Sequence, residues 1–168
     1  MSTLTLDLTE AKKLYPTASA QWKAKLEDAF GKTALIETDI TDRVKSYEDA
    51  CAIKGMVPRT LARYRLAFTD ASEDEIEGEF AFHQLTVICE VLNEGWIGDY
   101  NNSEEKKHYP WFEWSDATSG FGFSFSFYVF TYSLTFVGSR LCFRTDKLAA
   151  FAGRTFLKIY NKVLIKQK

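Results

Sequence analysis

The stretch Phe121-Gly-Phe-Ser-Phe-Ser-Phe-Tyr-Val-Phe130 decides the fold class that the sequence predicts. It lies in a window, residues 117–139, that carries no charged side chain. Aromatic side chains recur at every second position, which is typical of a β-strand because successive side chains point to opposite faces. At Tyr128 the aromatics move from odd to even positions, and one strand cannot keep both sets on one face. We therefore expect a bulge or a turn near residues 127–131.

Further strands are expected on both sides of this stretch. Residues 116–120 hold small and polar residues that are typical of a turn, and Gly138 marks another break. The expected strands cover residues 111–115, 121–127, 134–137 and 140–143. Together they predict a three- or four-stranded antiparallel meander over about residues 110–143. The period of two also argues against a membrane-spanning helix in this window, since such a helix has a period of 3.6.

The rest of the chain predicts helices. Ser72-Glu-Asp-Glu75 fits a capping box, in which the first and last residues bond to each other's backbone. Thr145 is placed to cap the last helix. The expected helices cover residues 8–15, 17–30, 41–54, 58–68, 72–93 and 146–164. We expect one α+β domain over residues 1–168, with an N-terminal helical layer (about 8–94), the meander (about 110–143) and a C-terminal helix (about 146–164) packed on the sheet.

The C-terminal helix has an apolar stripe that should cover the sheet. The stripe consists of Leu148, Phe151, Phe156, Ile159 and Val163. Burying one large aromatic side chain contributes about 2 kcal/mol. We therefore expect Phe121, Phe123 and Phe125 to be largely buried beneath Phe151, Phe156 and Ile159.

Composition bounds the function classes. The formal net charge of −2 argues against tight binding of nucleic acid driven by charge alone. The three cysteines are an odd number with wide spacing, which suits a reducing compartment better than a disulfide framework. The first residues, MSTLTLDLTEAKK, show no basic leader or apolar run, so we expect no signal peptide and a cytoplasmic location.

Three parts of the chain resemble a group of uncharacterised small proteins encoded in phages and prophages of gut Bacteroidales. The resemblance is carried by residues 40–51 (ITDRVKSYEDAC), by residues 92–96 (LNEGW) with 99–103 (DYNNS) and 109–112 (YPWF), and by residues 137–143 (VGSRLCF) with 148–153 (LAAFAG). It implies a phage protein that is cytoplasmic or associated with the virion. It implies no activity and no catalytic residues.

One polar loop is the leading candidate for a small binding site. Oxygen-bearing side chains alternate from Asp99 to Ser103, as at the start of a calcium loop, but position six is Glu104 and position twelve is Pro110. Asx turns explain the same residues, so we expect no metal and no cofactor. The candidate site consists of Trp96, Asp99, Asn101 and Tyr109. The alternative is that the loop only joins the long helix to the first strand.

Two further patterns bear on nucleic acid. Residues 120–123 (GFGF) are similar to part of an RNA-recognition motif, but Ser119 stands where that motif has a basic residue, and a packed sheet explains the phenylalanines. Arg154, Lys158 and Lys162 recur every four residues on the last helix, where they could contact phosphates or an acidic partner. A solvated face would give the same pattern.

The sequence favours a binding protein over an enzyme. The only histidines, His83 and His108, have no Ser or Cys close in sequence that could act as a nucleophile. Cys142 lies between two arginines that could lower its pKa, but burial of this cysteine in a strand is the simpler explanation. The leading hypothesis is a non-enzymatic accessory protein of a phage or prophage, acting through contacts with a protein partner or as a homo-oligomer. The alternative is a nucleic-acid-associated phage protein that uses the basic helix and the aromatic sheet.

Overall fold

The computed structural model describes residues 6–35, 39–116, 119–133 and 138–166. By its internal contacts the chain divides into two compact units, Met1–Asp39 and Ile40–Lys168. That residues 1–168 form a single domain stays a prediction.

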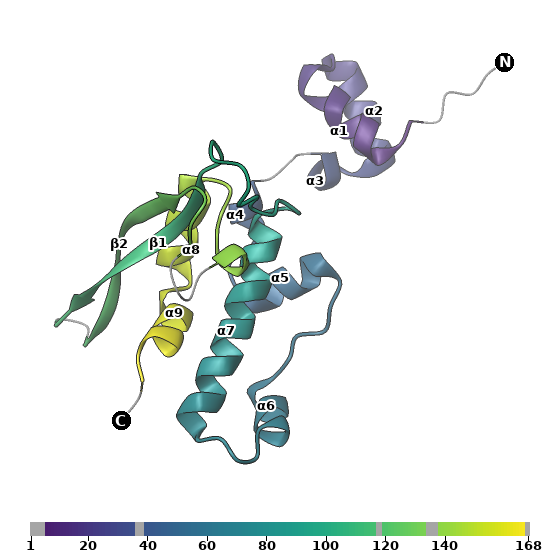
Figure 1. Cartoon of the computed structure of the whole chain (residues 1–168). Coiled ribbons are helices and arrows are strands. Elements are labelled where there is room, and N and C mark those ends of the chain that lie inside the picture. Colours follow the sequence, from purple (N-terminus) through teal and green to yellow (C-terminus); the bar gives the residue numbers. More distant parts are fainter. Residues whose placement is uncertain (1–5, 36–38, 117–118, 134–137, 167–168) are drawn as a thin grey trace. The chain divides into compact units, whose positions relative to one another are not determined.

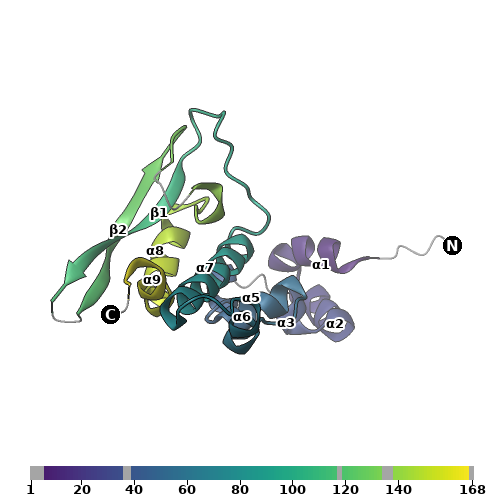
Figure 2. The same cartoon turned by 60° about the horizontal axis from the view of Figure 1, so that its bottom comes forward.

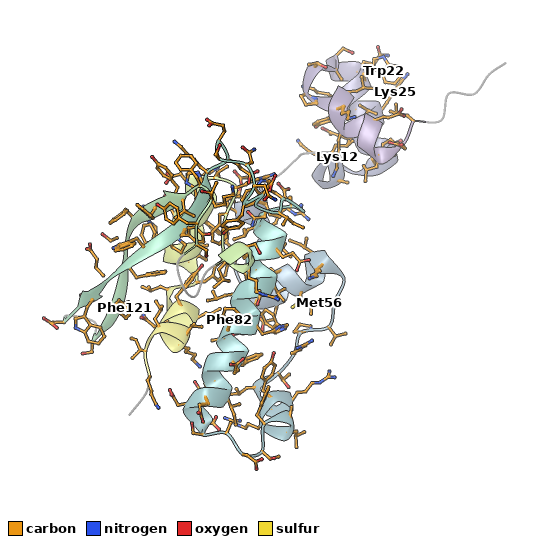
Figure 3. The ribbon with its side chains drawn as sticks, in the orientation of Figure 1. Lys12, Trp22, Lys25, Met56, Phe82 and Phe121 are labelled. Carbon is orange, nitrogen blue, oxygen red and sulfur yellow. The ribbon has the colours of Figure 1, made fainter. Side chains whose placement is uncertain are left out.

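The first unit is a small helical cluster. It contains α1 (Leu8–Leu14), a 3₁₀ turn (Tyr15–Thr17), α2 (Ala20–Phe30) and α3 (Lys32–Leu35). Its buried core is limited to Ala11, Leu26 and Leu35. Ser19 caps α2, two residues later than the predicted start at Thr17. Trp22 and Leu26 lie four residues apart on α2, but Trp22 is largely exposed whereas Leu26 is buried (Figure 3).

The long helix α7 is the centre of the second unit. The unit begins with α4 (Ile40–Arg43), α5 (Tyr47–Lys54), α6 (Leu61–Ala67) and α7 (Glu73–Leu92). Ser72 and Glu75 form the predicted capping box at the start of α7. Helices α5 and α6 pack on one side of α7 and α9 (Leu157–Leu164) packs on another, as Figures 1 and 2 both show. The predicted helical layer is therefore present, and its core lies around α7.

The sheet is an antiparallel hairpin of two strands. β1 (Lys107–Ser115) pairs with β2 (Gly120–Val129). Residues 134–137, where one further strand is predicted, lie outside the described residues. Gly138–Arg140 forms a 3₁₀ turn, and Phe143 joins β1 only by an isolated bridge to His108, with backbone N–H to O distances of 2.9 and 2.8 Å. A meander of three or four strands is thus not confirmed.

A bulge splits the phenylalanine row between the two faces of this hairpin. Trp111 lies opposite Phe125 and the next residue, Phe112, lies opposite Phe123. Ser124 therefore has no residue opposite it on β1. As a result, Phe121 and Phe123 point to one face of the hairpin, and Phe125 and Phe127 point to the other face. The predicted irregularity near residues 127–131 is wrong in position, because β2 pairs regularly from Phe125 to its end at Val129.

The inner face of the hairpin packs on the C-terminal helices. The predicted last helix is two helices, α8 (Asp146–Thr155) and α9, which meet at Phe156. Thr145 caps α8 as predicted. Gly153 of α8 lies so close to the sheet that an added Cβ would be 2.3 Å from the Phe123 ring. On α9, the side-chain amide of Asn161 both donates to and accepts from the backbone of Phe121, at 3.0 Å each.

The outer face of the hairpin carries exposed aromatic residues. Trp111, Phe125 and Phe127 are 40%, 45% and 37% exposed. The prediction that Phe125 is buried beneath the last helix is therefore wrong, because the bulge turns it away from α8. Phe121 and Phe123 do face the helices and are half-buried. Figure 2 shows the hairpin with α8 and α9 along one side of it.

The three cysteines are buried and form no disulfide. Cys89 on α7 lies with its Sγ 3.1 Å from the carbonyl oxygen of Cys142. Among residues 6–35, 39–116, 119–133 and 138–166, no helix is both long and apolar enough to cross a bilayer.

Candidate functional site

The loop between α7 and β1 folds around a buried lysine. The side chain of Lys107, the first residue of β1, is fully buried. Its ammonium group donates to the backbone carbonyls of Asp99, Asn102 (3.2 Å) and Glu105 (2.9 Å). The Glu105 carboxylate lies 3.3 Å from the same Nζ atom. A buried charge is costly unless it is paired and hydrogen-bonded, and the loop supplies both.

The polar side chains of the predicted site are used by the loop itself. Asp99 accepts from the backbone N–H of Asn101 at 2.9 Å, which closes an Asx turn. The Glu105 carboxylate accepts from the Asp99 N–H at 2.7 Å and from the Trp96 indole at 3.3 Å. Burial raises the pKa of Glu105, but these bonds and that from Lys107 outweigh it and hold the pKa below its usual value. These bonds are those that the structural alternative predicts, and a binding role for the loop stays a prediction.

The resemblance to a calcium loop has a physical explanation in this geometry. Carbonyl oxygens do converge on a cation, but the cation is the ammonium of Lys107. No group of three or more His, Cys, Asp or Glu side chains that could hold a metal ion occurs in the described part of the chain.

Tyr109 joins this loop from the sheet. It is buried with Val129 and Cys142, and Trp96 packs against them. Its hydroxyl lies 2.6 Å from that of Tyr100 and donates to the Gly138 carbonyl at 3.2 Å. Burial, followed by the bond with Tyr100, raises the pKa of Tyr109 well above its usual value.

The Trp96 indole and the Asp99 N–H both donate to Glu105, and Tyr109 joins the loop through Tyr100. Asp99 and Asn101 are both exposed. Sequence reasoning missed Lys107 and Glu105, which hold the loop. A pair of lysines is expected to be solvated, and nothing in the sequence separates the buried Lys107 from its exposed neighbour Lys106.

The most accessible candidate site is the outer face of the hairpin. We call Trp111, Phe125 and Phe127 the outer aromatic patch. Trp111 stacks on Phe125 across the strands, with ring centres 5.7 Å apart and an interplanar angle of 17°. The Phe127 ring centre is 6.0 Å from Trp111 in an edge-on arrangement. Exposed aromatics in one cluster are typical of interaction surfaces, where Trp often carries much of the binding energy.

The predicted basic row is not continuous. The guanidinium carbon of Arg154 lies 4.7 Å from the ring centre of Phe123, on the inner side of the sheet. Lys162 pairs with Glu77 of α7 at 2.8 Å. Lys158 lines a cavity that Arg154 also lines. The row is broken because α8 ends at Thr155 and α9 begins at Leu157, so the three cations do not share one helix face.

The candidate catalytic groups occupy structural positions. The Tyr47 hydroxyl lies 3.1 Å from Nε2 of His83. Burial lowers the pKa of both His83 and His108. Burial raises the pKa of Cys142, which is opposite to the shift that a reactive thiol needs.

Comparisons with known proteins add no relative. A scan against protein-family models, a search of curated proteins and a search of solved structures each found no match to this chain.

Proposed function

We propose that this chain is a non-enzymatic binding protein that acts through contacts with protein, and that the outer aromatic patch is its contact surface. One observation carries the proposal: Phe125 and Phe127 both contact Trp111, and each of the three rings is more than a third exposed. From the resemblance to phage and prophage proteins we further propose that this binding occurs in a phage-infected cell or in the virion.

The energetics favour association at this face. Each of the three rings keeps a large apolar area in water, and covering an apolar area gains about 25 cal/mol per Å². The bulge at Ser124 turns Phe125 and Phe127 outward although the helices α8 and α9 lie beside the sheet. Phe125 and Phe127 thus keep on the surface apolar area that the core of the protein does not use.

The free edge of β2 supports the same proposal. Within residues 119–133 and 138–166, no further strand pairs with β2. Asn161 takes the place of a partner strand at Phe121 only. Unpaired strand edges add strands from other chains, so a partner could bind the patch and the edge together.

The alternative is a nucleic-acid-associated protein that combines the aromatic sheet with the basic helix. Stacking on bases would require Arg154, Lys158 or Lys162 beside the exposed rings. Arg154 lies on the inner face of the sheet and Lys162 is paired with Glu77. This separation of Arg154 and Lys162 from the outer aromatic patch favours protein contacts.

The test compares two tryptophans on opposite faces of β1. Trp111→Ser changes the patch, whereas Trp114→Ser removes a tryptophan of similar exposure from the other face. Sedimentation velocity at high protein concentration measures self-association, and pull-down followed by quantitative binding to each recovered protein measures partner capture. We expect Trp111→Ser to weaken the association at least about 30-fold, as for a hot-spot residue, and Trp114→Ser to change it little.

Circular dichroism of both variants checks that they remain folded. A chain that stays monomeric and captures no protein, yet shifts single-stranded or duplex DNA in a salt-dependent way, would overturn the proposal in favour of the alternative.

A further inference from the structure

A second candidate site lies apart from the outer aromatic patch, in a cavity of about 530 Å³. The start of α5, Gln84 of α7 and the junction between α8 and α9 line it. Three of the lining residues are cations, Lys45, Arg154 and Lys158, and the only acid among them is Glu48. Ligand cavities commonly measure about 300–1,000 Å³, so this one has room for a small molecule.

The break between α8 and α9 lies between two of these cations, Arg154 and Lys158. In one continuous helix Arg154, Lys158 and Lys162 would form a single row, because residues four apart share a face. Phe156 has φ −106° and ψ 22°, which ends α8 and starts α9 in a new direction. Arg154 and Lys158 line the cavity on either side of this break, whereas Lys162 is paired with Glu77.

The cations have few competing partners. The Lys45 ammonium is 3.9 Å from Asp42, in a pair whose side chains are both well exposed, and 5.2 Å from the ring centre of Phe151. Arg154 rests on the ring of Phe123. Lys158 makes no ion pair or hydrogen bond within the described part of the chain. Exposed salt bridges are weak, so the positive charge at this cavity is largely uncompensated.

The surrounding groups suit an anion with several oxygen atoms. Gln84 and Thr155 line the cavity and carry N–H and O–H donors.

We propose that this cavity binds a small anion that carries one or more phosphate groups, up to the size of a nucleotide. Arg154 would bind it through the fork of its guanidinium and Lys45 and Lys158 as point charges. A small ligand fits better than a nucleic-acid chain because the cations converge on one cavity and the whole chain has a net charge of −2. None of the residues involved belongs to the outer aromatic patch, so this site is independent of the proposed protein contacts.

Isothermal titration calorimetry of the full chain with pyrophosphate and with ADP, at constant ionic strength, tests the proposal. We expect saturable binding of one equivalent. Lys158→Gln and Arg154→Gln should each weaken it about tenfold, the loss expected for one charge-assisted hydrogen bond. Glu48→Gln should tighten it, because it removes the one acid that lines the cavity. Tighter binding of ADP than of pyrophosphate would assign a nucleotide, and equal binding would assign the phosphate groups alone.

Lys166→Gln is the matched control. It removes the same charge from the next position of the sequence row, but Lys166 lines a different surface hollow. Absence of binding at millimolar pyrophosphate and ADP would overturn the proposal. So would equal weakening by Lys166→Gln and Lys158→Gln, which would show a diffuse charge effect. Binding of a single-stranded oligonucleotide that pyrophosphate does not displace would also overturn it.

Discussion

Replacing Lys107 with methionine isolates the contribution of the buried ammonium group. Methionine has a similar length and apolar stem, so Lys107→Met removes the charge and the three N–H donors with little change in volume. The carbonyls of Asp99, Asn102 and Glu105 then lose a donor, and the Glu105 carboxylate loses its ion pair.

The expected cost follows from the surroundings of each group. Breaking one partner out of a buried ion pair costs about 3–5 kcal/mol. Two effects reduce this figure: the variant no longer buries a charge, and the Glu105 side chain is 26% exposed and can recover water. We therefore expect a loss of about 3 kcal/mol in the free energy of unfolding, at the lower end of that range.

Urea unfolding at neutral pH measures this loss. With an m-value of about 2 kcal/mol/M, the midpoint should fall by about 1.5 M. Lys106→Met is the matched control, because Lys106 is the exposed neighbour and its ammonium contacts only the Tyr128 ring among the described residues. Its midpoint should move by less than about 0.5 M. Equal midpoints for Lys107→Met and the unchanged protein would refute the reasoning.

Three further outcomes are expected. Phe123→Ala should destabilise the protein by about 3 kcal/mol and Phe125→Ala by less than about 1 kcal/mol, since only the first ring faces the helices; similar losses in thermal or urea unfolding would contradict the bulge. Asp99→Ala should cost about 1 kcal/mol in the same assay through the lost Asx turn, and should leave binding to any recovered partner intact; lost binding with unchanged stability would restore the loop as a binding site. Stability should fall as the pH drops from 7.5 through about 6.5 to 5.5. Burial lowers the pKa of His83 and His108 in the folded protein, so the unfolded chain takes up protons first. A urea midpoint that rises or stays constant over this interval would contradict that sign.

Helix starts were predictable because their signals are local. Ser72 with Glu75, and Thr145, each satisfy backbone groups within three residues, and both caps are present. The alternation in β2 correctly indicated a strand for the same reason, since a period of two belongs to the strand itself. The Asx turn at Asp99 was likewise readable from the residue type.

The face of each phenylalanine was not predictable, because the bulge is fixed by contacts between distant segments. The repeat of Phe and Ser continues unchanged through Ser124, so the sequence gives no sign of the unpaired residue. The close approach of Gly153 to Phe123 and the stacking of Phe125 on Trp111 are both tertiary contacts. The break of the last helix at Phe156 has the same origin, since the apolar stripe runs on across it.

The candidate sites show the same limit. The row of Arg154, Lys158 and Lys162 was visible as a spacing, but the cavity needs Lys45 from a segment about 110 positions earlier. Lys107 gave no signal at all, because burial of a lysine depends on carbonyls that only the folded loop brings together.

Ser124 is the residue of β2 that has no partner on β1, and the position of this unpaired residue decides which side chains of β2 point outward. Because phenylalanine and serine alternate on both sides of Ser124, this defect in the pairing can shift by two residues without changing either end of the strand. A defect at Ser126 would place Phe125 opposite Pro110 and turn it inward, leaving Phe127 as the only phenylalanine of the repeat on the outside. A defect at Gly122 would instead turn Phe123 outward and leave Ser124 against the helices. The location of a single defect thus sets how many phenylalanines the surface displays, and the close fit of Phe123 against Gly153 disfavours a defect at Gly122, where that number would be three.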